Sequence, residues 1–184
     1  MNLPLCGDIL YEMTVIASIV LGSNGAASLR GSSQGLSTPS DRARFLQRHR
    51  SAAAFIIGKK SAAIESYQKS QVPIYVFTRS SEKLDLSHPL MAQIFVHENL
   101  VEVINQISAD VTGDIVVEAG PSLLLALAEA GAIEILELSI SPFEGDGDFI
   151  SIEKLLTLFE IVSDIEIDGT RLLQGRDKSN ATNG

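Results

Sequence analysis

The segment Gly113-Asp-Ile-Val-Val-Glu-Ala-Gly-Pro-Ser-Leu-Leu-Leu-Ala-Leu-Ala-Glu-Ala-Gly131 decides the fold class of this chain. Its first residues, up to Glu118, are mostly β-branched and apolar, which predicts a strand buried on both faces. Residues 119–121 predict a turn, and residues 122–130 predict a helix that ends at Gly131. A buried strand that passes through a short turn into a helix is typical of a parallel sheet with helical crossovers.

The same alternation of strands and helices extends over most of the chain. We expect further strands at 13–21, 54–57, 72–77, 94–96 and 133–140, and helices at 38–51, 61–68 and 99–110. The late segment Leu155 to Leu173 alternates as a β-hairpin does, with its turn near Asp168-Gly169. These elements predict an α/β fold with a mostly parallel sheet and antiparallel edge strands at the C-terminal end.

The size and composition of the chain predict one compact domain. The chain has 184 residues, of which 45% are hydrophobic and 20% charged, which excludes wholesale disorder. We assign residues 1–175 to a single domain and expect the polar residues 176–184 to form a disordered tail. Cys6 is the single cysteine and the three histidines lack metal-ligand spacing, so we expect neither a disulfide nor a metal site.

Hydropathy and charge favour a cytoplasmic protein that binds neither membranes nor nucleic acid. The longest strongly apolar stretch, Met13 to Gly22, has ten residues, whereas a spanning helix needs about 20. No basic residue precedes Arg30, so a secretory leader is not expected either. The net charge of −9 argues against binding to nucleic acid or anionic lipid.

Basic residues are concentrated between Arg30 and Lys60. That window holds seven basic residues and one acidic residue, Asp41, which gives it a local charge of +6. A cationic region on an acidic protein suits a small phosphorylated ligand. The alternative is a solvent-exposed helix face that happens to be basic.

Three turns compete for a ligand site, because ligands of such sheets bind beyond the carboxyl ends of the strands. They are Gly22–Gly25, Gly58–Ser61 and Glu118–Ser122. In the third turn, the strand ends on a carboxylate, the glycine allows close approach of a ligand, and a helix begins, which suits a phosphate. The alternative is an ordinary turn whose glutamate forms a salt bridge. The sequence contains no P-loop, dinucleotide-type glycine motif or nucleophile elbow.

Together these turns resemble the pyrimidine reductase of riboflavin biosynthesis, a family with the dihydrofolate-reductase-like fold. Val117-Glu-Ala-Gly-Pro-Ser-Leu123 matches the family signature Val-Glu-Gly/Ala-Gly-Pro-Ser/Thr-Leu in full. Gly22-Ser-Asn-Gly25 lies where the family has Ser-x-Asp-Gly, and Gly58-Lys-Lys-Ser61 where it has Gly-x-x-Thr. The serine-rich loop Gly31 to Ser37 and the segment Ala130 to Pro142 also match, so the resemblance is collinear from Met13 to Gly147.

The resemblance implies NADPH as cofactor and a small phosphorylated pyrimidine as substrate, whose ribose is reduced to a ribityl chain. It implies Asn24 and Glu118 as catalytic residues and Ser33 and Glu118 as substrate contacts. One of Arg48, His49 and Arg50 would hold the substrate's phosphate, and the sequence leaves open which one. The implied cofactor-binding residues are Gly58, Ser61, Glu65, Thr78, Arg79, Ser80, Gly120, Pro121, Ser122 and Leu123. The family also implies a homodimer, with the hydrophobic late strands as its interface.

Two departures from the family pattern matter for function. Asn24 replaces the usual aspartate and cannot act as a general base near neutral pH. His49 falls where the family has an arginine, and no zinc-deaminase signature is present. The alternative function is therefore a catalytically silent or substrate-diverged member that acts as a dimeric ligand-binding or assembly protein.

Overall fold

The computed structural model describes residues 13–63, 67, 69–86, 88–96 and 99–178. Over these residues the main sheet has eight strands in the order β5-β4-β3-β6-β1-β7-β10-β9. The parallel strands are β1 (Val15–Gly22), β3 (Ala54–Gly58), β4 (Ile74–Thr78), β5 (Met91–Phe95), β6 (Ile115–Glu118) and β7 (Ile135–Ser141). The antiparallel strands are β9 (Phe159–Ile167) and β10 (Thr170–Asp177). The predicted sheet, mostly parallel with antiparallel strands at one edge, is confirmed.

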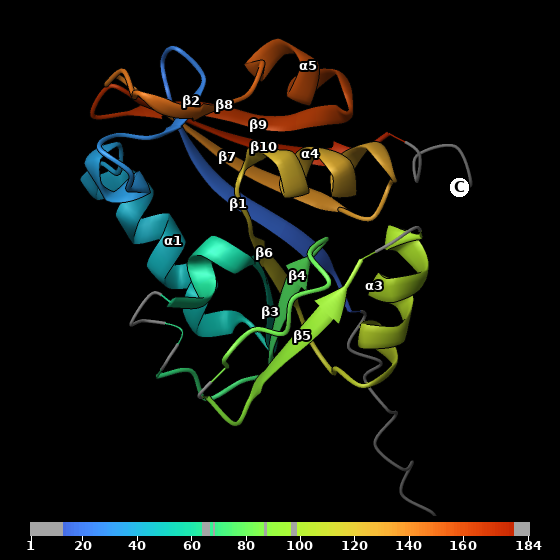
Figure 1. The fold of residues 1–184 in the computed structure, drawn as a ribbon. Helices are drawn as coiled ribbons and strands as arrows, with labels where there is room; N and C mark the ends of the chain where they lie inside the picture. Colours follow the sequence, from blue (N-terminus) through green and yellow to red (C-terminus); the bar gives the residue numbers. More distant parts are fainter. Residues whose placement is uncertain (1–12, 64–66, 68, 87, 97–98, 179–184) are drawn as a thin grey trace, which may run out of the picture.

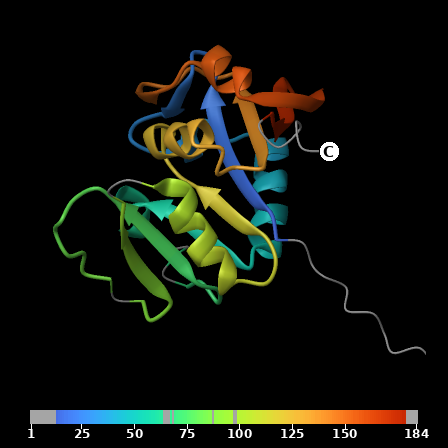
Figure 2. The ribbon, with the colours of Figure 1, turned by 90° about the vertical axis from the view of Figure 1, so that its right-hand side faces the viewer.

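Helices cover both faces of this sheet and make three layers (Figures 1 and 2). On one face lies α1 (Pro39–Ser51), and on the other lie α3 (Leu100–Ala109) and α4 (Pro121–Glu129). Shorter elements are α5 (Ile152–Thr157), the 3₁₀ turns η1 (Ser33–Gly35) and η2 (Lys59–Ala63), and the strands β2 (Ala26–Ser28) and β8 (Gly147–Phe149). Strands β2 and β8 pair with each other in a small antiparallel sheet.

The alternation of side chains along β6 explains why the strand is buried on both faces. Ile115 and Val117 belong to the core beneath α3 and α4, whereas Val116 belongs to the core on the face of α1. All three side chains are fully buried. Both faces of β6 are shielded from solvent, so every residue of the strand gains stability by burying apolar surface. A continuous apolar run is therefore stable at this central position of the sheet.

Helix boundaries follow the predicted capping residues. The Thr38 side chain accepts a hydrogen bond from the Asp41 N–H, and Pro39 occupies the first turn of α1. Helix α4 begins at Pro121 and is followed by Gly131, which has a φ of 68°. That left-handed conformation favours glycine, so the predicted helix end is confirmed.

The structure corrects the predicted C-terminal hairpin at both of its ends. Leu155 lies in α5 rather than in a strand, because the Ser151 side chain caps this short helix and Leu155 is buried in the core. Strand β9 starts only at Phe159, although the turn at Asp168-Gly169 is confirmed. Strand β10 continues to Asp177, past the predicted domain end, because the Asp177 N–H donates to the Glu134 carbonyl at 3.0 Å.

Some predictions fall partly outside the described residues. The helix predicted at 61–68 begins as the 3₁₀ turn η2, and residues 64–66 and 68 are not described. The same holds for residues 179–184 of the predicted tail. Among the described residues, none of the helices is long and apolar enough to cross a membrane.

Candidate functional site

The carboxyl ends of β3, β4 and β6 meet at one edge of the sheet. Ile57 pairs with Glu118, and Gly58 pairs with Phe77, so the three strands finish at nearly the same level. The turn after β3 and the turn after β6, both predicted as ligand sites, therefore lie close together. This convergence follows from the register of the parallel strands. The sequence pattern predicts a parallel sheet but not its register.

A pocket of about 260 Å³ opens where these strands end. It is lined by Gly58, Lys59, Phe77, Thr78, Arg79, Val96, Leu100, Ser122, Leu123 and Ala126. Gly58, Thr78, Arg79, Ser122 and Leu123 of this lining are among the predicted cofactor-binding residues. The other lining residues were not predicted from the sequence. Most of those are apolar and carry no signal in a single sequence, but Lys59 lies inside the turn already singled out.

The pocket lining fits a ligand that is anionic at one end and apolar at the other. A Cβ atom added at Gly58 or Gly120 would meet no atom within 4 Å, so the backbone at both positions borders open space. Ser122 and Leu123 lie in the first turn of α4, where backbone N–H groups favour a phosphate. Lys59 and Arg79 add positive charge, and Phe77 and Leu100 provide apolar surface. A phosphorylated dinucleotide such as NADPH has this combination of groups.

The other predicted cofactor residues are placed differently. Ser61 lies in η2 and Pro121 is buried at the start of α4, and neither lines the pocket. The Ser80 N–H donates to Thr78 Oγ1 at 3.1 Å, which makes a local turn directly after β4. Glu65 lies outside the described residues.

Glu118 is a buried carboxylate at the end of β6, with only 8% of its surface exposed. The Tyr67 hydroxyl donates a hydrogen bond to its Oε2, and His49 Nδ1 lies 3.4 Å from its Oε1. The His49 ring packs against Phe55, with ring centroids 4.5 Å apart. Burial, and then the negative charge of Glu118, raises the pKa of Tyr67 well above its usual value. Sequence reasoning missed Tyr67, because it lies outside every motif.

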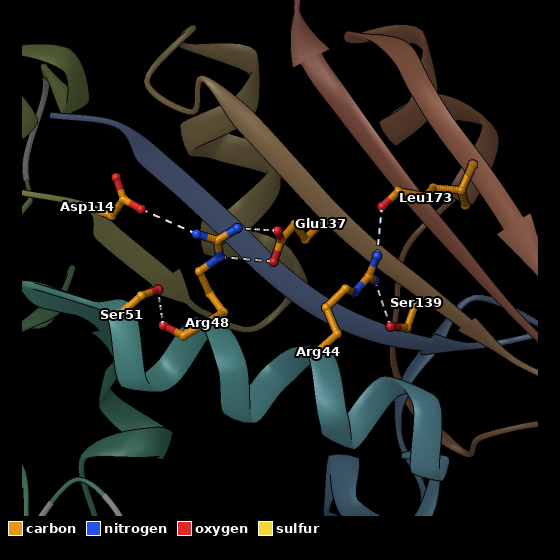
Figure 3. A network of polar contacts seen from close by, with 7 residues as sticks. All are labelled: Arg44, Arg48, Ser51, Asp114, Glu137, Ser139 and Leu173. Atoms are coloured by element: carbon orange, nitrogen blue, oxygen red, sulfur yellow. Dashed lines mark hydrogen bonds and ion pairs between the residues drawn. The ribbon is translucent and has the colours of Figure 1, made fainter. Parts of the chain in front are cut away.

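The three candidate phosphate-binding residues of α1 lie in different surroundings (Figure 3). Arg48 Nη2 is 2.5 Å from Glu137 Oε1, and its Nη1 is 3.3 Å from Asp114 Oδ2. The hydrogen bond to Glu137 raises the pKa of Arg48. Arg50 is exposed to solvent. His49 is thus the candidate that lies beside Glu118, whereas Arg48 is held in an ion-pair network; a contact with phosphate stays a prediction.

Many residues of the cationic window hold the protein together. Arg44 donates to the Leu173 carbonyl at 3.0 Å and to Ser139 Oγ at 2.7 Å (Figure 3). Its burial lowers its pKa. Lys59 pairs with Glu82 at 3.0 Å, and Lys60 pairs with Asp148 at 3.3 Å. Several cations of this window therefore bind partners within the protein, and its contact with a phosphorylated ligand stays a prediction.

Asn24 holds two loops together. Its Nδ2 donates to the Gly145 carbonyl at 2.9 Å, and its Oδ1 accepts from the Gly145 N–H at 3.1 Å. The Ala26 N–H also donates to Oδ1, at 3.3 Å. The amide thus matches both polar groups of one residue, and a carboxylate would repel the Gly145 carbonyl. The catalytic role expected for Asn24 stays a prediction, and so does a substrate contact by Ser33, which lies exposed in η1.

Comparison with solved structures identifies the fold. A pyrimidine reductase-like protein from Corynebacterium diphtheriae superposes with a TM-score of 0.68 at 15% identity, covering 89% of this chain and 91% of that chain. Dihydrofolate reductase from Enterococcus faecalis, complexed with NADP(H), gives 0.63 at 15% identity, covering 90% and 96%. The chain has the dihydrofolate-reductase-like fold.

A third structure with the dihydrofolate-reductase-like fold belongs to a bifunctional protein. It is the diaminohydroxyphosphoribosylaminopyrimidine deaminase/5-amino-6-(5-phosphoribosylamino)uracil reductase from Thermotoga maritima. The TM-score is 0.63 at 14% identity, and the match covers 89% of this chain and 56% of that protein. No protein-family model and no curated protein matches the sequence. The three solved structures confirm the dihydrofolate-reductase-like fold expected from the sequence motifs.

Proposed function

We propose that the protein is an NADPH-dependent reductase that transfers hydride to a phosphoribosylamino-pyrimidinedione. The observation that carries this proposal is the position of the Glu118 carboxylate, which lies on the strand next to the β3–β4 pocket. This arrangement puts a buried carboxylate, which we assign to the substrate, beside a pocket whose lining suits a dinucleotide. The family-like stretch Val117 to Leu123 contributes to both parts, because it includes Glu118, Ser122 and Leu123.

The cofactor half of the site is formed by the pocket at the ends of β3 and β4. Ser122 at the start of α4 and the cations Lys59 and Arg79 would hold the phosphates, with Lys59 exchanging its exposed ion pair with Glu82 for the ligand. Phe77 and Leu100 would contact the flat apolar rings. When bound, NADPH supplies the hydride. The protein's own contribution is to orient the two ligands and to exclude water between them.

The substrate half of the site centres on Glu118. Its carboxylate is a hydrogen-bond acceptor, which suits the N–H groups of an aminopyrimidinedione ring. His49 beside it, and Ser33 in the exposed turn η1, are the residues we assign to the rest of the substrate. The reduced group is the ribose, which becomes an open ribityl chain.

The protein is further proposed to act as a homodimer through β9. This edge strand exposes Ile161, Val162, Ile165 and Ile167, with relative exposures between 37% and 52%. An exposed apolar edge strand presents unpaired backbone groups and favours pairing with another chain. A second copy of this chain would cover both the apolar side chains and the edge.

The test is an anaerobic assay of NADPH oxidation with 5-amino-6-(5-phosphoribosylamino)uracil. We expect NADPH consumption to match formation of the ribityl product, and Glu118→Ala to abolish it while NADPH affinity is nearly unchanged. NADPH that fails to bind, seen as an unmoved melting curve at saturating cofactor, contradicts the proposal. Binding of both ligands without turnover instead supports a ligand-binding or assembly protein. The observation that favours this second function is the engagement of the Asn24 amide by Gly145.

A further inference from the structure

Each oxygen of the Glu118 carboxylate faces a different side chain. Oε2 accepts a hydrogen bond from the Tyr67 hydroxyl, and Oε1 lies 3.4 Å from His49 Nδ1. The two partners come from separate parts of the chain, since His49 belongs to α1 and Tyr67 to the connection between η2 and β4. The orientation of this carboxylate is therefore set by three segments rather than by β6 alone.

The Tyr67 ring is packed in a fixed orientation beside Glu118. Only 6% of its surface is exposed. Its ring meets Phe55 edge-on, with centroids 6.0 Å apart and an interplanar angle of 71°. The His49 ring lies 6.2 Å from it, at 48°. This aromatic packing fixes the ring, so the direction of the hydroxyl is fixed as well.

The Tyr67 hydroxyl acts as a donor to Glu118. A tyrosine has one O–H group, and burial together with the charge of Glu118 raises its pKa, so the proton stays on the oxygen near neutral pH. Oε2 is thereby occupied by a partner inside the protein. Oε1 faces His49, and because a carboxylate oxygen can accept two hydrogen bonds, it can still accept one from a ligand.

We propose that Tyr67 is a positioning residue, which fixes the Glu118 carboxylate with Oε1 toward the ligand and thereby selects ligands that carry an N–H donor. The ligand part of this inference rests on the proposed function. A carboxylate only accepts hydrogen bonds, so a fixed Oε1 rewards a ring N–H or amino group and disfavours a carbonyl at the same place. An aminopyrimidinedione offers such donors.

The experiment compares Tyr67→Phe with Tyr75→Phe in the whole chain. Both variants lose one hydroxyl and keep the ring. Tyr75 on β4 is the matched control, because it is partly buried but packs against the core on the opposite face of the sheet. For Tyr67→Phe, we expect the Kd of 5-amino-6-(5-phosphoribosylamino)uracil to rise about ten-fold, because binding must then also order the Glu118 side chain. We expect the Kd of NADPH to stay unchanged, and Tyr75→Phe to change neither constant. Equal Kd values for the pyrimidine in Tyr67→Phe and wild type overturn the proposal.

A second measurement separates this inference from the proposed function. Urea unfolding of wild type, Tyr67→Phe, Glu118→Met and the double variant measures the coupling between the two residues without any ligand. We expect a coupling of about ten-fold in the folding equilibrium constant. If the wild type does not bind the pyrimidine but the coupling is present, the proposed substrate is wrong and the positioning of Glu118 by Tyr67 stands. Absence of coupling overturns the positioning role, whatever the substrate.

Discussion

Arg48 donates two hydrogen bonds to Glu137, from Nη2 to Oε1 at 2.5 Å and from Nε to Oε2 at 3.2 Å. This fork-like contact fastens the last turns of α1 to β7 (Figure 3). The next residue, His49, points to Glu118 on β6 instead. The same turn of α1 therefore contacts both β7, through Arg48, and β6, through His49.

Arg48→Met is expected to destabilise the protein by about 2–4 kcal/mol, because it leaves the buried Glu137 without its main partner. Urea unfolding measures the change. The matched control is Arg171→Met, whose ion pair with Asp164 is exposed on β10 and β9, and whose loss costs about 0–1 kcal/mol. A loss for Arg48→Met no larger than for the control contradicts the anchoring role of this pair.

Tyr67 makes stability fall at alkaline pH. Its pKa is raised above the ordinary value of 10.0 in the folded state. The stabilisation is therefore complete below pH 10, and it decreases as the pH rises further, because only the unfolded chain then releases the proton. Urea midpoints measured between pH 9 and about pH 11 should fall more steeply for wild type than for Tyr67→Phe. Parallel curves for the two proteins would show that the Tyr67 hydroxyl is not buried against Glu118.

Gly58→Val tests the cofactor pocket. A Cβ at this position has no atom within 4 Å, so the fold tolerates the side chain, which instead fills pocket space. We expect the Kd of NADPH, measured by calorimetry, to rise about ten-fold or more, since each 1.4 kcal/mol of lost binding is a factor of ten. Ala92→Val, at an exposed position of β5, is the control and should bind NADPH as the wild type does. If both variants bind NADPH with the same affinity, the cofactor does not bind in this pocket.

Asn24→Asp is expected to lower stability by about 1 kcal/mol, because a carboxylate loses the donor to the Gly145 carbonyl and repels it. Thermal unfolding checks this change. Asn105→Asp adds the same charge at an exposed position of α3 and should unfold at nearly the wild-type temperature. A gain of reductase activity in Asn24→Asp, with unchanged stability, would instead show that the residue acts on the substrate.

Ile165→Lys tests the proposed dimer. Ile165 lies in the second half of the edge strand β9 and is 52% exposed, and a charge there prevents pairing of apolar edges. Light scattering should report a dimer for wild type and a monomer for the variant. Leu90→Lys is the control, because Leu90 is 40% exposed but lies just before β5, at the opposite edge of the sheet. A wild-type monomer at micromolar concentration excludes the dimer.

Local signals were enough to predict most elements of the fold. The pair Thr38-Pro39 predicted the start of α1, and the apolar run before Glu118 predicted the central strand β6. The helix start depends on interactions between residues close in sequence, and the strand depends on burial of all its residues. The helix α5 was missed, because its capping residue Ser151 precedes only six helical residues, too few to show a helical period.

The sequence by itself determined the alternation of strands and helices and the positions of the turns that we assign to ligands, because hydrophobic periodicity and capping are local properties. Only the tertiary structure decided which partner each polar side chain meets. In the folded protein, Arg48 pairs with Glu137, whereas His49 contacts Glu118. Tyr67 also contacts Glu118, from the connection between η2 and β4. Such contacts join residues far apart in the chain, and their geometry depends on strand register and helix placement, which no short stretch of sequence encodes.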